Sequence, residues 1–303
     1  MSYILCLHFY KKTWKKTMIT SNFVHKNTTT FSLEFFPPKT TQAQEKLDQT
    51  LESLLPFHPT HINVTYGADG STKTNTKELA TQIQNKHNVP VVAHLTCYNA
   101  TKQQIHDILQ YYQNNNIHNI FALRGDPPQD KIIPTQTDFS HAIHLVQYIK
   151  QHFPNMIIGV AGFPHGHPES SNQQQEIEYL KQKIDAGADY ICTQLFYDNT
   201  AFYQYIEQCQ KIKVSIIPGL MPIHTKQLLD KIQQLAPNTK IPTTLQQQLQ
   251  KATTDEQIQD IFIHWTIQQI QDLQKNNIHH FHLFTLNQTS TIMPILQTLH
   301  ANK

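Results

Sequence analysis

The segment TFSLEFFPPKT (30–40) decides between the two parallel-sheet folds open to this chain. Its first part, TFSLEFF, is short, aromatic and partly β-branched, as expected of a buried strand. In a doubly wound open sheet, a Gly-rich phosphate loop normally follows the first strand. Here the strand runs into two prolines, and no GxGxxG or GxxxxGK(S/T) motif occurs anywhere in the sequence. The segment therefore favours a closed barrel, with the open sheet as the alternative.

Outward from this segment, eight short β-rich runs alternate with amphipathic helical patterns. Eight strands, each followed by a helix, predict an α/β fold, the (β/α)8 TIM barrel, and the length of the chain suits it. Residues 223–278 hold two or three extra helices before the last strand. The runs are TFSLEFF (30–36), HINVTY (61–66), VVAHLTC (91–97), HNIFALR (118–124), MIIGVAGF (156–163), YICTQLF (190–196), VSIIPGLM (214–221) and HFHLFTL (280–286).

The 303 residues are enough to bury one large core, and we expect a single catalytic barrel domain over residues 29–303. Residues 1–28 place apolar before basic side chains, the reverse of a secretory signal, and are interpreted as an extension, disordered or upstream of a true start at Met18.

A net charge of +2 and the lack of an apolar run of about 20 residues argue against nucleic-acid and membrane partners. Four Cys without CxxC spacing indicate a reducing, cytoplasmic location.

Polar side chains gather where the predicted strands end, and in a TIM barrel the chemistry lies at those ends. Seven of the eight strands place such a side chain near one rim. In chain order the strand ends give Glu34, Thr65, Tyr66, His94, Thr96, Arg124, Gly125, Asp126, Phe163, His167, Gln194 and Gln288.

Glu34 is the most informative of these residues, because it lies inside the apolar run from Phe31 to Phe36. A buried carboxylate is costly unless it is paired or protonated. Burial among aromatic rings is expected to raise its pKa, which suits a general acid near neutral pH. The alternative is a structural Glu whose charge a neighbouring strand satisfies.

Arg124 is the only Arg among 24 cationic residues, so its position is a candidate for a role that Lys cannot fill. Arg124-Gly-Asp126 can present both charges to one cavity, or form an ion pair within the turn. The Gln194 amide can match the donor and acceptor edge of a heterocycle, or cap a strand-end carbonyl. The residues alone leave both pairs of alternatives open.

Nineteen His residues raise the question of a metal site. His165 and His167 form an HxH pair, and His279, His280 and His282 lie close together. Zinc needs three or four converging ligands, and barrel metallohydrolases often carry HxH on their first strand. Here the HxH pair follows the fifth strand, so we predict no metal site.

Taken together, the strand-end motifs are similar to those of the methylenetetrahydrofolate reductase family, in its bacterial form that consists of the barrel alone. They occur in the family's order and cover about residues 30–300. EFFPPK, LRGD and the TQ-aromatic segment are the most specific of them. The matching segments are SLEFFPPK (32–39), VTYGA (64–68), AHLTC (93–97), ALRGD (122–126), HPE (167–169), KIDAGA (183–188), TQLF (193–196), IPG (217–219) and FTLN (284–287).

The resemblance implies a barrel that binds FAD at its C-terminal rim without a Rossmann fold. The implied reaction reduces 5,10-methylenetetrahydrofolate to 5-methyltetrahydrofolate with NADH or NADPH, by ping-pong hydride transfer through FAD, and feeds methionine synthesis. By motif, Glu34 is the implied general acid at folate N10, and Asp126 shapes the electrostatics of flavin and pterin. The implied substrate-binding residues are Asp126, Gln194, Gln227 and Gln288. The implied FAD contacts are Thr65, Tyr66, Ala68, His94, Arg124, Gly125, Asp126, Ser140, Phe163, His167, Ser170, Glu176 and Lys183.

Some positions depart from the bacterial pattern. Gln288 stands where Arg commonly faces the glutamate tail of folate, and Gln182 stands where Arg lies near the FAD phosphates. Phe163 replaces a Tyr and Tyr179 an Asn. The loss of positive charge at Gln182 predicts that FAD is released easily, and the change at Gln288 predicts weaker binding of the tail.

The partners implied are small molecules, together with further copies of the chain, because the family is oligomeric. The choice between NADH and NADPH is not encoded in any motif of this sequence. Two other functions remain as alternatives. One is a flavin-free barrel hydrolase or lyase that uses Glu34 and Asp126 as a carboxylate pair, and the other is a binding protein without catalysis.

Overall fold

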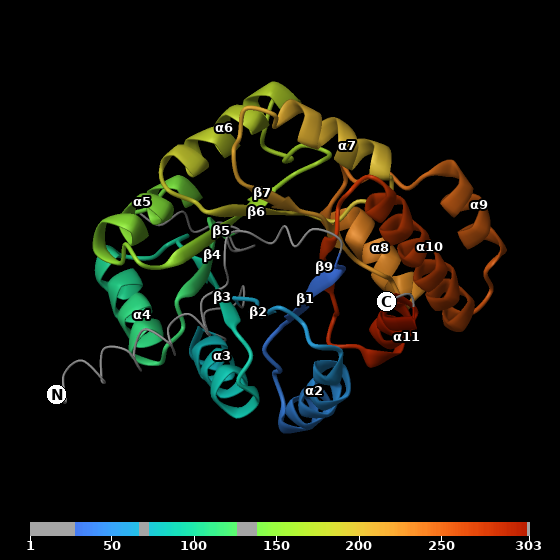
Figure 1. Cartoon of the computed structure of the whole chain (residues 1–303), viewed down its shortest axis with the longest axis horizontal. Helices are drawn as coiled ribbons and strands as arrows, with labels where there is room; N and C mark the ends of the chain where they lie inside the picture. The colour runs from blue at the N-terminus through green and yellow to red at the C-terminus, as the bar shows by residue number, and fades with distance from the viewer. Residues whose placement is uncertain (1–27, 67–72, 126–137, 302–303) are drawn as a thin grey trace.

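The computed structural model describes residues 28–66, 73–125 and 138–301. In this part of the chain parallel strands form a nearly closed barrel, surrounded by helices (Figure 1). The prediction of a (β/α)8 TIM barrel is confirmed. The strands are β1 (Thr30–Phe35), β2 (Ile62–Val64), β3 (Val91–Thr96), β4 (Asn119–Leu123), β5 (Ile157–Gly162), β6 (Tyr190–Thr193), β7 (Ser215–Ile217), β8 (Gly219–Leu220) and β9 (His280–Phe284).

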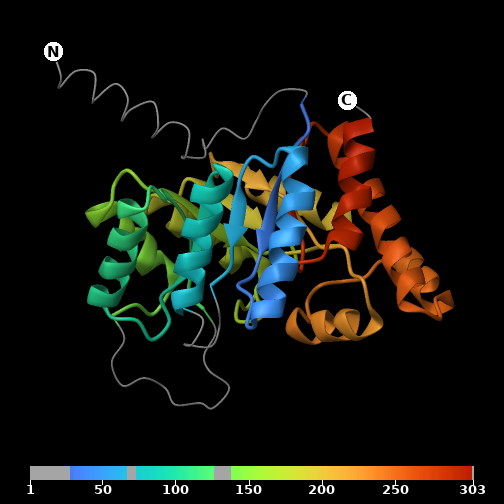
Figure 2. The same cartoon turned by 90° about the horizontal axis from the view of Figure 1, so that it is seen from below.

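The helices pack outside the barrel wall and run alongside the strands (Figure 2). Three of them, α8, α9 and α10, fill the long gap before the last strand, as the sequence predicts. Side-chain caps fix several helix starts; for example, Thr101 and Gln104 form a capping box at the start of α4. The helices are α2 (Thr41–Leu54), with a 3-10 turn over Leu55–Phe57, α3 (Lys73–His87), α4 (Lys102–Asn114), α5 (Ala142–His152), α6 (Gln173–Asp185), α7 (Asn199–Gln208), α8 (Lys226–Leu235), α9 (Thr243–Lys251), α10 (Asp255–Lys275) and α11 (Thr289–Ala301).

The barrel closes through Pro218. The strand order is β7-β6-β5-β4-β3-β2-β1-β9-β8, and only Pro218 separates the two end strands in the chain. The sequence predicts one strand over residues 214–221, whereas the structure divides it, because proline has no backbone N–H for the ladder. The Pro218 carbonyl still accepts a hydrogen bond from the His282 N–H at 2.9 Å. The segment therefore joins both ends of the sheet.

Side chains alternate along each strand between the outer helices and the barrel interior. The interior has two halves of different chemistry. The polar half, on or beside β9, β1, β2 and β3, consists of Ser32, Glu34, His61, Asn63, His94, His280 and His282. The apolar half, on β3, β4, β6 and β7, consists of Val92, Phe121, Tyr190, Cys192 and Ile217.

Within the described residues, no helix has the length and apolar character needed to cross a bilayer. Cys97, Cys192 and Cys209 are buried free thiols. Cys6 lies outside the described residues.

Candidate active site

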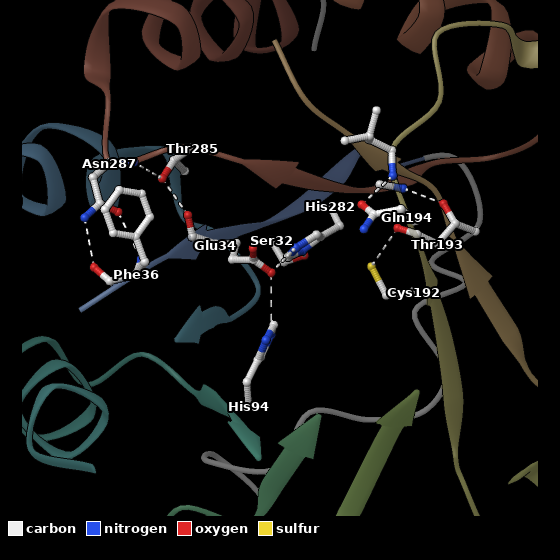
Figure 3. A network of polar contacts seen from close by, with 12 residues as sticks. Ser32, Glu34, Phe36, His94, Cys192, Thr193, Gln194, His282, Thr285 and Asn287 are labelled. Atoms are coloured by element: carbon white, nitrogen blue, oxygen red, sulfur yellow. Dashed lines mark hydrogen bonds and ion pairs between the residues drawn. The ribbon is translucent and has the colours of Figure 1, made fainter. Parts of the chain in front are cut away.

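Glu34 lies near the end of β1 with its carboxylate between two imidazoles from neighbouring strands (Figure 3). His282 of β9 donates from Nε2 to Glu34 Oε2 at 3.2 Å. His94 Nε2 of β3 lies 3.5 Å from the same oxygen. The Glu34 side chain is 17% exposed, against 2% for His282 and 7% for His94. The carboxylate is therefore the member of this group that a ligand in the barrel mouth can reach.

His282 also connects Glu34 to Ser32. Its second ring nitrogen, Nδ1, accepts from Ser32 Oγ at 2.9 Å, because Nε2 carries the proton donated to the carboxylate. Ser32 and His282 are paired in the register of β1 and β9, so both side chains enter the barrel at one level. The result is a buried hydrogen-bonded chain from Ser32 through His282 to Glu34.

The two histidines change the acidity of Glu34. Burial raises the pKa of the carboxyl group, but the hydrogen bond from His282 and the fields of His94 and His282 together outweigh it, and the pKa lies below its usual value. The expectation of a raised pKa is wrong for the ligand-free pocket. Burial lowers the pKa of His94 to about 4, against the attraction of Glu34. At neutral pH the pocket therefore holds an ionised Glu34 beside a neutral His94.

A turn after β9 fixes the position of the Glu34 backbone. Thr285 Oγ1 donates to the Glu34 carbonyl at 2.5 Å. Asn287 holds the next exposed residue, Phe36, from both sides: its Oδ1 accepts from the Phe36 N–H at 3.0 Å and its Nδ2 donates to the Phe36 carbonyl at 2.9 Å. The last strand of the barrel thus clamps the end of the first.

A cavity of about 370 Å³ opens at the same rim, and Gln194 lines it together with Arg124. Its other walls are residues 163–169, after β5, and residues near the end of α8. Gln194 Oε1 accepts from the Leu195 N–H at 2.9 Å. Cys192, two residues before Gln194 on β6, is close enough to Glu34 for the carboxylate to raise its pKa further, beyond the effect of burial. Glu34 itself is not among the residues that line this cavity.

Arg124 forms a bidentate pair with Glu169 at the edge of the cavity, with NH2 2.8 Å from Oε1 and NH1 on Oε2. The guanidinium and the hydrogen bond from it are the main cause of the lowered pKa of Glu169. Gly125 has φ +85°, and a Cβ there would lie 2.9 Å from Thr96 Cβ, so only glycine lets the ends of β3 and β4 approach. Asp126 lies outside the described residues, so its pairing with Arg124 stays a prediction.

The comparison with known families decides the identity of the barrel. The model of the family described as methylenetetrahydrofolate reductase matches residues 19–300. The chain belongs to this family. Methylenetetrahydrofolate reductase (NADH) 1 of Arabidopsis thaliana is 36% identical over 286 residues, which are 89% of this chain and 48% of that protein. 5,10-Methylenetetrahydrofolate reductase of Escherichia coli K12 is 30% identical over 271 residues, which are 88% of this chain and 90% of that protein.

The chain spans about half the length of the plant relatives and most of the length of the bacterial ones. The resemblance to the methylenetetrahydrofolate reductase family is confirmed. A solved barrel is also similar: an uncharacterized protein from Clostridium thermocellum described as binding two copies of 5-methyl-5,6,7,8-tetrahydrofolic acid, with a TM-score of 0.61 and 12% identity. The match covers 96% of this chain and 99% of that one. At that identity the likeness concerns the fold alone.

Six of the residues that the resemblance predicts to contact FAD lie in two places, the cavity and the region of α6. Arg124, Phe163 and His167 line the cavity with Gln194. Ser170 Oγ donates to Glu176 at 2.8 Å, and Lys183 Nζ donates to the Ala161 carbonyl of β5 at 3.3 Å. Burial lowers the pKa of Lys183, and Glu176 opposes this effect.

The remaining expected residues of the family site lie elsewhere on the same rim or beyond the described part. The Thr65 carbonyl accepts from Thr76, and burial raises the pKa of Tyr66 to about 12. Ser140 contacts His144 at 3.1 Å. Gln227 is exposed on the first turn of α8, and Gln288 contacts Lys46. Ala68, like Asp126, lies outside the described residues.

Ser32, His282 and Glu169 were not predicted as site residues from the sequence. His282 was considered only as a member of a possible metal cluster. The period-two alternation of HFH (280–282) and of SLE (32–34) was the available signal, because it puts alternate side chains on one face of each strand.

Proposed function

We propose that this chain is a flavin-dependent methylenetetrahydrofolate reductase, which reduces 5,10-methylenetetrahydrofolate to 5-methyltetrahydrofolate and so supplies methionine synthesis. NADH or NADPH would deliver the hydride through FAD in two successive half-reactions. The observation that carries the proposal is the Ser32–His282–Glu34 chain at the barrel mouth, in a member of this family. We further propose one FAD-binding catalytic domain over residues 29–303, in an oligomer in the cytoplasm.

The described residues fit an anionic dinucleotide cofactor. Arg124 supplies a guanidinium, and Phe163 and His167 supply aromatic surface in a cavity of about 370 Å³, within the range of about 300–1,000 Å³ for small-molecule pockets. Lys183 places a second cation beside β5. Bound FAD would supply the hydride carrier. To bind FAD, the Arg124 guanidinium must either release the Glu169 carboxylate or contact the carboxylate and the cofactor together.

Glu34 would act as the acid that protonates the N10 side of the folate. Its lowered pKa in the ligand-free pocket means that a proton must reach it as the substrate binds. Solvent can supply that proton while the carboxylate is still 17% exposed, and His282, held at Nδ1 by Ser32, keeps the carboxyl group oriented through its Nε2–H. A substrate that covers the 17% exposed carboxylate also removes it from water, which favours the protonated acid.

Gln194 and Asp126 would hold the pterin. Gln194 Oε1 accepts from the Leu195 N–H, so the Nε2 amide group is the donor that Gln194 would offer to the pterin. Asp126 follows Gly125 directly at the end of β4, on the same rim. Its carboxylate would match the amino-pyrimidine edge of the pterin by hydrogen bonding.

The test separates the two half-reactions. Glu34→Gln should leave flavin reduction by NADH largely intact, because no proton transfer to folate occurs there. Reoxidation by methylenetetrahydrofolate should fall by about 100-fold to 10,000-fold, the usual contribution of a general acid. Stopped-flow absorbance of the flavin measures both. Glu52→Gln, at an exposed Glu that pairs with Lys86, is the matched control and should change neither rate. Equal loss of both half-reactions in Glu34→Gln would contradict the acid role, and purified protein without flavin or folate turnover would overturn the proposed function.

A further inference from the structure

The turn after β9 has an unusual backbone conformation. Leu286 and Asn287 both lie in the left-handed region, with φ of +53° and +55°. Asn enters this region readily, whereas Leu does so rarely because its Cβ crowds the following carbonyl oxygen. Leu286 packs, with Phe284, on the apolar cluster of α8, α9 and α10. Conformations of this kind persist only where neighbouring contacts hold them, and they gather at functional sites. The turn is therefore expected to serve the site beside it.

Backbone hydrogen bonds along β1 alternate between its two neighbouring strands. The Phe35 carbonyl accepts from the Thr65 N–H on the β2 side at 2.9 Å, and the Glu34 carbonyl accepts from the Thr285 N–H on the β9 side at 3.3 Å. Phe36 comes next, so its backbone groups face the β9 side again. The register between β1 and β9 ends at Glu34, however, because the chain turns away from β1 after Thr285.

The side chain of Asn287 supplies the pairing at Phe36 (Figure 3). Its Oδ1 accepts from the Phe36 N–H at 3.0 Å, and its Nδ2 donates to the Phe36 carbonyl at 2.9 Å. A primary amide carries the donor and the acceptor of a peptide group, so Asn287 acts as one further rung of the ladder. Thr285 Oγ1 joins the two levels, because it accepts from the Asn287 N–H at 3.1 Å and donates to the Glu34 carbonyl at 2.5 Å. The main chain is therefore fixed at the Glu34 carbonyl and again two residues later.

The position of the Glu34 carboxylate depends on this backbone. On a strand the backbone sets the direction in which a side chain leaves it. The carboxylate has to meet two buried imidazoles: His282 Nε2 lies 3.2 Å from Oε2, and His94 Nε2 lies 3.5 Å from the same oxygen. A displacement of β1 at Glu34 would move the carboxyl group relative to His282 and to the folate. Misplacement of a reacting group by about 1 Å costs about 100-fold in rate.

We infer that Asn287 is a positioning residue for the proton transfer: through the Phe36 backbone, and together with Thr285, it fixes the place where Glu34 presents its carboxyl group. The inference rests on the proposed function and adds to it two residues that act through Glu34. It also assigns a role to the left-handed turn, which aims both polar side chains at β1 while Leu286 anchors the turn in the apolar cluster.

A double-mutant cycle on the flavin-loaded protein tests this inference. Asn287→Gly removes the amide and keeps the left-handed backbone, which glycine adopts freely. At saturating methylenetetrahydrofolate it should slow reoxidation of the reduced flavin about tenfold to 100-fold. The rate of flavin reduction by NADH and the Kd of 5-methyltetrahydrofolate should stay within about twofold of the wild type, because neither needs the acid. In the Glu34→Gln background, Asn287→Gly should cause no further loss, because the group that it positions is already absent. Stopped-flow absorbance of the flavin gives the rates, and calorimetry gives the Kd.

A second pair of variants tests the same role at Thr285. Thr285→Val keeps the shape of the side chain and removes the hydroxyl group that donates to the Glu34 carbonyl, so it should slow the same reoxidation step. Thr285→Ser, which keeps the hydroxyl group, should recover most of the rate that Thr285→Val loses. These variants test the inference even where Asn287→Gly does not fold.

Asn277→Gly is the matched control, because Asn277 is an exposed, left-handed Asn (φ +62°) before the opposite end of β9. It should change neither rate. Reoxidation at the wild-type rate in Asn287→Gly, or a full additional loss in the Glu34→Gln background, would overturn the inference and leave the proposed function standing. Equal loss of both half-reactions and of folate affinity would also overturn it, because it would show a general structural role. A wild-type protein whose reduced flavin is not reoxidised by methylenetetrahydrofolate would overturn the inference and the proposed function together.

Discussion

The two halves of the barrel interior are built from parallel strands of the same wall, but polar and titratable side chains fill one half and apolar side chains fill the other. The polar half holds one carboxylate and four imidazoles in a region where Glu34, at 17%, is the most exposed side chain. The apolar half packs rings and aliphatic side chains around Phe121 and Tyr190. They meet where His94 packs on Phe121, with ring centroids 4.8 Å apart.

The difference shows what keeps each half stable. In the polar half, nearby hydroxyl groups form hydrogen bonds with two of the imidazoles: Thr30 contacts His280 at 2.8 Å and Thr60 contacts His61 at 3.0 Å. The rings of His61 and His280 stack with centroids 5.9 Å apart, an arrangement that tolerates little added positive charge. The apolar half depends on close packing instead. We therefore expect protonation of the histidines to destabilise the polar half and added side-chain volume to destabilise the apolar half.

Acid should produce the largest effect. Burial, with the fields of other histidines, lowers the pKa of His61 well below 6.5, and burial lowers the pKa of His94 to about 4. Below pH 6.5 these histidines bind protons in the unfolded chain but not in the folded one. The free energy of unfolding therefore decreases as the pH decreases, until the pH reaches the folded pKa. Once the pH is well below 6.5, each such group loses about 1.4 kcal/mol per pH unit, so His94 alone loses on the order of 2 kcal/mol between pH 6.5 and 5, and His61 adds to that loss. The lowered pKa of Glu34 acts in the same direction at still lower pH.

Urea unfolding at pH 8, 7, 6 and 5 measures this loss as a free energy of unfolding. His61→Phe keeps a ring against His280 and removes one titrating group, so it should flatten the pH dependence. His264→Gln, at an exposed histidine of α10, should leave the dependence unchanged. A free energy that stays level from pH 7 to 5 would contradict the account of the polar half.

Added volume in the apolar half comes next. A Cβ at Gly159 of β5 would lie 2.3 Å from Tyr190 Cζ and 2.7 Å from Phe121 Cδ2. Gly159→Ala should therefore destabilise the protein by about 3 kcal/mol, toward the upper end of the range for overpacked cores. The loss should be the same at pH 8 and pH 6, unlike that of the polar half. Chemical denaturation at both pH values measures it.

A second substitution checks that steric overlap is the cause. Tyr190→Leu removes the ring atoms nearest to the new methyl group, so Gly159→Ala should cost less in that background than alone. Additive losses in the double variant would mean that the overlap does not explain the effect.

The smallest effect concerns the cofactor proposed for the same rim. Gln182 is exposed on α6, where its amide lies 3.5 Å from Glu178. Gln182→Arg should slow FAD release by about twofold to fivefold, because an exposed cation near an anionic ligand contributes modestly. Flavin fluorescence after dilution follows the release. Gln174→Arg, near the start of the same helix, is the control for added charge alone. FAD that already stays bound in the wild type through long dilution would contradict the expectation of easy release.

Much of the fold follows from local sequence. Runs such as VVAHLTC and YICTQLF are β-rich and short, and each becomes a strand of the wall. The missing phosphate loop after TFSLEFF correctly favoured the closed barrel over the open sheet, which the sequence left as the alternative. The one predicted strand over residues 214–221 is divided at Pro218, and the cause is again local, because proline has no N–H to continue the ladder.

The site was predictable only in part, because its contacts join distant segments. Glu34 was recognised from its apolar neighbours, but its acidity depends on His94 and His282, the second of which lies 248 residues away in the chain. Burial alone predicts a raised pKa, and only coordinates reveal the two imidazoles that reverse it. Arg124 was likewise identified as special, while its partner Glu169 was not. The roles assigned to Asp126 and to the cofactor contacts stay predictions.

The pairing of β1 with β9 has a consequence for how the protein is made. A ribosome completes the first strand long before the last, so Glu34 waits for most of synthesis without the imidazole that later donates to it. Pairings this distant in sequence form slowly. The barrel can shut only when its final strand arrives, and that same event assembles the acid, its donor and the clamp on Phe36. Chains that stall before strand β9 would hold an open sheet edge and an unpartnered carboxylate, and quality control could tell them from finished molecules by that edge.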